Sequence, residues 1–134
     1  MKKTYHGSCH CGAVRYEAAI DMDAGSGRCN CSICQKTRSW GVLIKPEDFK
    51  LVSGEDMLST YQFGTMSGDH IFCRRCGVRP FGRGYVEAIG GHFVSIQVGT
   101  LDDVSPAELA AIQIRYQNGR DNAWWNEPEE TRHL

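Results

Sequence analysis

Seven cysteines are the residues of this sequence whose type and spacing point most directly to chemistry. They fall into three groups, which are Cys9-His10-Cys11, Cys29-Asn30-Cys31-Ser32-Ile33-Cys34 and Cys73-Arg74-Arg75-Cys76. An odd number of cysteines cannot form a closed set of intramolecular disulfides, and clustered thiols in a reducing compartment are typical of metal sites. We therefore expect these groups to bind metal ions.

The number of cysteines in each group indicates how the ligands divide. Zinc prefers four tetrahedral ligands, and a closely spaced pair supplies two. The first and third groups are pairs that can close one structural all-thiolate site, formed by Cys9, Cys11, Cys73 and Cys76. The middle group leaves three thiolates, a number typical of a catalytic zinc with an exchangeable fourth position, formed by Cys29, Cys31 and Cys34. The prediction is two zinc ions per chain. The spacing leaves open a second structural ion, a middle group of free thiols, or ligands shared between the middle group and either neighbour.

Several other side chains near the cysteines have a functional and a structural interpretation. His10 and His70 are candidates to hydrogen-bond a metal-bound sulfur. Lys36 and Arg38 follow the middle group and are candidates to attract a carboxylate of a thiol substrate. Solvated surface or strand positions are the alternative for all four.

Arginine and tryptophan pairs elsewhere are open to two interpretations in the same way. Arg74 and Arg75 are candidates to neutralise a dianionic four-thiolate site, and contact with DNA is the weaker alternative. Trp124 and Trp125 either line a substrate cleft or pack a terminal segment against the fold. Gly82-Arg83-Gly84 lacks the spacing of a phosphate-binding loop, so we expect a turn there.

Length and composition limit the architecture and the partners. The 134 residues are expected to form a single domain, 1–134, and 15 basic against 16 acidic residues give a net charge of -1. Bulk attraction to nucleic acid is therefore not expected. The longest apolar runs, such as Val42 to Ile44, are far shorter than the roughly 20 residues that span a bilayer. The N-terminus lacks the apolar core of a secretory signal, so we expect a cytoplasmic protein without a membrane partner.

The segments that must position the cysteines have the pattern of short strands. Apolar residues alternate from Val14 to Ala18 and from His92 to Val98, as in strands with one buried face. Shorter strands are expected at 40–44, 58–63, 69–73 and 112–117. Ser105-Pro106-Ala107-Glu108 predicts a capped helix through about Ala111. The fold class is therefore mainly β with short helices.

The cysteine motifs and their surroundings resemble the glutathione-dependent formaldehyde-activating enzyme family. The resemblance is carried by the segments Gly7-Ser8-Cys9-His10-Cys11-Gly12-Ala13-Val14, Cys29-Asn30-Cys31-Ser32-Ile33-Cys34, Phe72-Cys73-Arg74-Arg75-Cys76-Gly77-Val78-Arg79-Pro80-Phe81-Gly82, Val98-Gly99-Thr100-Leu101-Asp102-Asp103 and Asn118-Gly119-Arg120-Asp121-Asn122-Ala123-Trp124. It covers nearly the whole chain.

This resemblance implies a β-tent fold, stapled by a structural zinc on Cys9, Cys11, Cys73 and Cys76, with a catalytic zinc on Cys29, Cys31 and Cys34. It also implies a carbon-sulfur lyase acting on thiol-aldehyde adducts, similar to S-hydroxymethylglutathione synthase, with a small-molecule thiol and an aldehyde as substrates. The family also includes centromere protein V, so a non-catalytic zinc-stabilised binding module that contacts protein or nucleic acid is the alternative.

Overall fold

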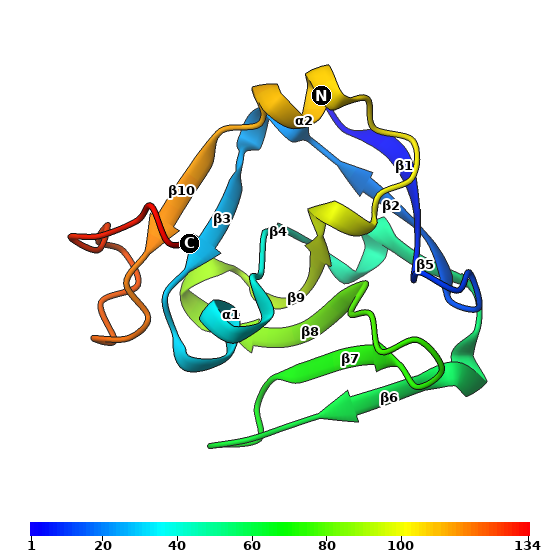
Figure 1. Cartoon of the computed structure of the whole chain (residues 1–134), viewed down its shortest axis with the longest axis horizontal. Coiled ribbons are helices and arrows are strands. Elements are labelled where there is room, and N and C mark those ends of the chain that lie inside the picture. Colours follow the sequence, from blue (N-terminus) through cyan, green and yellow to red (C-terminus); the bar gives the residue numbers. More distant parts are fainter.

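Ten short strands and two six-residue helices form the regular structure in the computed structural model, which describes all of residues 1–134 (Figure 1). The strands are β1 (Lys3–Ser8), β2 (Arg15–Ile20), β3 (Ser26–Cys29), β4 (Gly41–Ile44), β5 (Phe49–Ser53), β6 (Leu58–Tyr61), β7 (Asp69–Cys73), β8 (Phe81–Val86), β9 (Gly91–Gln97) and β10 (Ile114–Gln117). The helices are α1 (Ser32–Thr37) and α2 (Pro106–Ala111). Short 3-10 turns occupy Met22–Ala24, Pro46–Asp48, Glu55–Met57, Glu87–Ile89 and Val98–Thr100.

The strands form two sheets. One has three strands in the order β1-β2-β5, and the other has seven in the order β10-β3-β4-β9-β8-β7-β6. All pairings are antiparallel except that of β10 with β3. In Figure 1 the larger sheet curves from β10 to β6, and the smaller sheet lies across from its β10 end. This arrangement leaves the core between the two sheets.

The core is one cluster of 15 buried residues drawn from both sheets. An aromatic contact joins the sheets at its centre, where the Phe81 ring lies 6.1 Å from Tyr16 and 4.6 Å from Phe49. Tyr16 is also held by a 2.7 Å hydrogen bond between its hydroxyl and that of Thr100. The apolar face of each sheet is thus covered by the other, as a layered β fold requires.

Most of the predicted elements are confirmed. β2 and β9 lie where alternation predicts them, and β7 lies where a short strand is expected. Val94 and Ile96 on the shared face of β9 are almost completely buried. The expected strand at 58–63 ends earlier, at Tyr61. α2 begins as expected, with the Ser105 hydroxyl accepting a 3.1 Å hydrogen bond from the backbone N–H of Glu108. No helix in this structure has the length and apolar character needed to cross a membrane.

The turn expected at Gly82-Arg83-Gly84 is wrong, because these residues lie inside strand β8. A Cβ at Gly82 would lie 2.8 Å from the backbone oxygen of Asp69 on β7, and one at Gly84 would lie 2.5 Å from the ring of Phe93 on β9. The glycines therefore allow close approach of neighbouring strands and side chains, which is a known role of glycine inside strands.

Truncation of the central aromatic ring tests this description of the core. Phe81→Ala should lower the free energy of unfolding by about 3–5 kcal/mol, because it removes a fully buried ring from the contact between the sheets. Urea denaturation of identically prepared proteins measures the change. Val86→Ala, at an exposed position of the same strand, should cost within about 0.5 kcal/mol. Equal losses for the two variants would contradict a core centred on Phe81.

Candidate metal centres and adjoining cavities

Four cysteine sulfurs meet where the β1–β2 turn contacts the β7–β8 turn. Cys9 and Cys11 follow β1, while Cys73 ends β7 and Cys76 follows it. The two turns are closed alike, since the N–H of Cys9 donates to the carbonyl of Val14 and that of Cys73 to the carbonyl of Val78, both at 3.0 Å. The structure thus brings together the four cysteines that the ligand count paired.

The distances among these sulfurs suit a tetrahedral metal ion. The Sγ of Cys11 lies 3.6 Å from that of Cys9 and 3.8 Å from that of Cys73, and all four sulfurs are within 4.8 Å of one another. A tetrahedral ion with metal–sulfur bonds of about 2.3 Å holds its sulfurs about 3.8 Å apart. Backbone N–H groups of Cys11 and Val78 lower the pKa of Cys76 to about 6, which favours the thiolate that a metal requires.

The other three sulfurs gather between β3 and α1. Cys29 is the last residue of β3, Cys31 is the N-cap of α1, and Cys34 is its third residue. The side chains at the N-cap and at the third helical position lie close together at the start of a helix. The three sulfurs lie within 4.8 Å of one another, and this group, the three-cysteine loop, includes no further Cys, His, Asp or Glu.

Crowding among the three thiols sets their protonation. Hydrogen bonds with Cys29 and Cys34 hold the pKa of Cys31 well below its usual range. Hydrogen bonds with Cys29 and Cys31 raise the pKa of Cys34 instead. The loop therefore loses a first proton readily and retains another, because adjacent thiolates repel. A divalent cation would allow all three sulfurs to ionise, so the donor set fits zinc.

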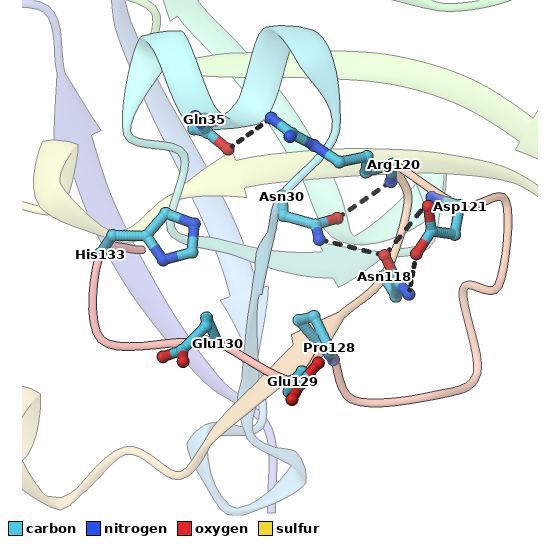
Figure 2. A pocket seen from close by; sticks show the side chains of 9 residues that line it. All are labelled: Asn30, Gln35, Asn118, Arg120, Asp121, Pro128, Glu129, Glu130 and His133. Carbon is cyan, nitrogen blue, oxygen red and sulfur yellow. Dashed lines mark hydrogen bonds between the residues drawn. The ribbon is translucent and has the colours of Figure 1, made fainter.

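A hydrogen-bond network fixes the backbone of this loop (Figure 2). The buried Asn30 side chain donates to the side-chain oxygen of Asn118 at 3.0 Å and accepts from the backbone N–H of Arg120 at 2.9 Å. Arg120 in turn donates to the side-chain oxygen of Gln35 on α1 at 3.3 Å. The segment after β10 therefore holds both the start of the loop and the helix that follows it.

The same segment contacts a sulfur of the loop. A Cβ at Gly119 would lie 2.8 Å from the Sγ of Cys29 and 2.5 Å from the ring of Trp124. Trp124 lies against Gly119 and donates its indole N–H to Asn122, and it is 42% exposed, whereas Trp125 is 75% exposed. This agrees with the packing interpretation of Trp124.

Three cavities surround α1. The C-terminal cavity, of about 280 Å³, is the one in Figure 2 and is lined by Asn30, Gln35, Asn118, Arg120, Asp121, Pro128, Glu129, Glu130 and His133. The arginine cavity, of about 450 Å³, is lined by Arg28, Thr37, Arg38, Trp40, Gly77, Val78, Arg79, Gln97 and Gly99. The aromatic cavity, of about 500 Å³, is lined by Ser32, Ile33, Lys36, Thr37, Tyr61, Phe63, His70, Phe72, Gly77 and Arg79. Ser32 and Ile33 lie between two of the cysteines, so the aromatic cavity adjoins the three-cysteine loop.

The histidine and arginine candidates are placed differently from one another. His10 is exposed, and so are Arg74 and Arg75 beside the four-cysteine cluster. His70 lines the aromatic cavity, where its ring stacks 5.5 Å from that of Phe63 and its Nδ1 lies 3.4 Å from the Arg79 guanidinium. Burial lowers the pKa of His70, so its imidazole is neutral at pH 7.

Lys36 and Arg38, the two cations that follow the middle cysteine group, line different cavities. Lys36 lines the aromatic cavity and Arg38 lines the arginine cavity. Sequence reasoning gave no role to Asn30, Gly119 or Arg79, although all three contact or adjoin the three-cysteine loop or its cavities. The only available signal was the position of Asn30 between two cysteines.

Known proteins match this sequence and fold. The family model described as glutathione-dependent formaldehyde-activating enzyme matches residues 4–118. A Halomonas elongata protein provisionally named a glutathione-dependent formaldehyde-activating enzyme is 40% identical over 78 residues, which are 52% of this chain and 50% of that protein. This chain therefore aligns with about half the length of that relative.

A solved structure extends the similarity over most of the fold. The crystal structure of a Rhodobacter sphaeroides protein matches with a TM-score of 0.68 and 31% identity, covering 82% of this chain and 99% of that one. The family match spans all seven cysteines, which the fold gathers into the two clusters described above. The chain belongs to the glutathione-dependent formaldehyde-activating enzyme family.

Proposed function

We propose that the protein is a zinc-dependent carbon-sulfur lyase that acts on adducts of a thiol with an aldehyde, with glutathione and formaldehyde as the pair that the family name indicates. The observation that carries the proposal is the three-cysteine loop, which offers three sulfurs, no fourth protein ligand in its group and a cavity beside it. The fold supports the family's β-tent architecture, because two sheets share one core. The same core supports a single domain over 1–134.

The absence of disulfides among the seven cysteines supports a cytoplasmic location.

The two clusters receive different roles in this proposal. Cys9, Cys11, Cys73 and Cys76 would hold a structural zinc between the two sheets, and Cys29, Cys31 and Cys34 would hold a catalytic one. A zinc ion bound by three thiolates supplies a position at which a substrate sulfur is stabilised as a thiolate. Such a site has a net charge of about -1, from +2 and three thiolates, which suits exchange of soft ligands.

The surrounding residues would bind and orient the substrates. In the synthetic direction the thiol sulfur forms a bond to the aldehyde carbon, and the thiol proton ends on the aldehyde oxygen as a hydroxyl. The lyase direction reverses both changes. The Nδ1 of His70 accepts from the Arg79 guanidinium, so the other ring nitrogen of the neutral imidazole carries hydrogen and can donate to the reacting oxygen in the aromatic cavity. Asn30 and Gly119 hold the loop that carries the sulfurs.

The first prediction of this proposal separates the two clusters by metal content. Cys9→Ser or Cys73→Ser should give unfolded or insoluble protein, because both sulfurs lie in the contact between the sheets. Cys31→Ser should remain folded and lose about one zinc of two. Elemental analysis and circular dichroism measure the two outcomes. Purified, reduced protein with no bound metal and unchanged thermal stability would contradict the zinc assignment.

The second prediction tests the contact between Gly119 and the Cys29 sulfur. Gly119→Ala should weaken zinc binding at the three-cysteine loop roughly 10- to 100-fold, because the added methyl displaces a ligand. Competition with a chromophoric chelator measures the affinity. Gly99→Ala, whose Cβ meets nothing within 4 Å, is the matched control.

The tryptophan contact at Gly119 needs its own control. Trp124→Ala combined with Gly119→Ala removes the clash with the ring but keeps the one with the sulfur. Zinc binding should therefore remain weak in the double variant. Full recovery of zinc affinity would show that the sulfur contact is not what limits the site.

The third prediction tests catalysis against the binding-module alternative. In cobalt-substituted protein, glutathione should change the absorption of the three-cysteine loop, because a fourth sulfur adds charge-transfer intensity. Cys31→Ser should lose this response and also the turnover of glutathione with formaldehyde. A spectrum that no thiol or aldehyde alters, together with no turnover over a panel of thiols and aldehydes, would favour the non-catalytic module.

A further inference from the structure

Arg79 has the only buried side-chain nitrogen or oxygen atoms of the protein that lack a hydrogen-bond partner, which are its Nε and Nη1. No carboxylate neutralises this guanidinium, because the four ion pairs of the protein have Met1, Lys2 and His6 as their cations. Buried polar groups without a partner are rare in native proteins, and a buried charge is costly unless an opposite charge lies nearby. The negative charge that compensates Arg79 must therefore come from another kind of group.

The position of Arg79 places it beside the three-cysteine loop. It lies in the turn between β7 and β8, and it lines the aromatic cavity together with Ser32 and Ile33 of the loop. Its Nη2 lies 3.4 Å from the Nδ1 of His70, and because a guanidinium only donates, that ring nitrogen accepts. The neutral imidazole of His70 holds one end of the guanidinium but brings no negative charge.

The sulfurs of Cys31 and Cys34 are the anionic groups that Arg79 faces. The unpaired Nε and Nη1 atoms lie near these two sulfurs, without a hydrogen bond to either. Burial lowers the pKa of Arg79, and electrostatic attraction to the sulfurs of Cys34 and Cys31 opposes that shift. The arginine and the ionised sulfurs thus form a pair of opposite charges away from bulk water, where such a pair interacts strongly.

The charge of Arg79 matters most when a fourth sulfur arrives. A divalent ion with three thiolates has a net charge of about -1, and a substrate thiolate changes this to about -2. With Arg79 included, the two totals are about 0 and -1, so the arginine lowers the electrostatic cost of the added thiolate. The four-cysteine cluster differs in this respect, because its neighbours Arg74 and Arg75 are exposed and screened by solvent.

We infer that Arg79 is a positioning residue, which balances the charge of the three-cysteine loop so that a fourth sulfur binds there as a thiolate. This inference rests on the proposed function for the metal ion and for its exchangeable position. It makes anionic ligands of that position dependent on Arg79 and leaves neutral ligands independent of it. The same guanidinium orients His70, so one side chain supports both the incoming sulfur and the proton donor.

The experiment compares two ligands of the exchangeable position in cobalt-substituted protein. Mercaptoethanol binds as an anion and has no carboxylate, whereas imidazole binds as a neutral molecule. Arg79→Met and Arg79→Gln remove the charge, and each should weaken mercaptoethanol binding about 10- to 100-fold, the effect of losing a nearby opposite charge. Imidazole affinity should stay unchanged. Absorption spectra recorded over a range of ligand concentrations give both affinities.

Two further variants are controls for the charge. Arg79→Lys keeps a positive charge and should recover part of the mercaptoethanol affinity. Arg132→Met removes an exposed charge and should change neither affinity. Arg79→Gln keeps a hydrogen-bond donor without the charge, so full mercaptoethanol affinity in this variant would overturn the inference.

The pattern across the two ligands distinguishes this role from a structural one. Equal weakening of mercaptoethanol and imidazole in the two neutral variants would show that Arg79 only supports the shape of the site, and would overturn the inference. Loss of the cobalt ion of the loop from both neutral variants, measured by elemental analysis, would show that Arg79 is needed to hold the metal itself. That result would overturn the inference as well.

Turnover of glutathione with formaldehyde, measured in parallel, separates this inference from the proposed function. Binding that depends on Arg79 for mercaptoethanol alone, in a protein without turnover, would refute the lyase proposal and support the role of Arg79. Turnover with the same mercaptoethanol affinity in all variants would refute that role and leave the lyase proposal standing. A cobalt spectrum that neither ligand alters in the unmodified protein would refute both.

Discussion

The contact between the β1–β2 turn and the β7–β8 turn is the constraint on which the rest of the molecule depends. Each turn belongs to a different sheet, and the sulfurs of Cys9, Cys11, Cys73 and Cys76 meet between them. Cys73 ends the strand next to β8, which carries Phe81 into the aromatic core, so the position of the turns and the closure of the core are linked. A chain of this size buries a modest core, so a metal ion that bound only the folded arrangement of these four sulfurs would add its binding free energy to the stability of the fold.

The two sulfur clusters differ in the number of sulfurs that they offer and in whether a cavity lies beside them. The four-cysteine cluster supplies a complete tetrahedral set and two of its sulfurs, those of Cys9 and Cys73, are almost inaccessible. The three-cysteine loop supplies one sulfur fewer and adjoins a cavity through Ser32 and Ile33. The same ligand chemistry therefore fits a structural role at one place and exchange with a substrate at the other, and the number of sulfurs is what separates them.

Much of the fold and the grouping of the seven cysteines could be predicted from local sequence patterns. Alternation predicted β2 and β9, and the Ser105 to Glu108 segment predicted α2, because these signals depend on neighbouring residues alone. β8 was missed because its glycines serve contacts with β7 and with Phe93, which no local pattern encodes. Gly119 and Arg79 were missed for the same reason: a clash with Cys29 and a missing acceptor appear only when distant segments come together.

Helix α1 connects the three-cysteine loop to all three cavities, and its length determines how. Six residues are too few for a helix to be stable on its own, so outside contacts must hold it. Those contacts are Cys34 in the sulfur group, Gln35 with Arg120, and Arg38 with the carbonyl of His133. Residues of α1 or its C-cap line the aromatic and arginine cavities, so the shape of both depends on the sulfur group at the start of the helix. Filling that group with a metal ion would therefore also fix the walls of both cavities.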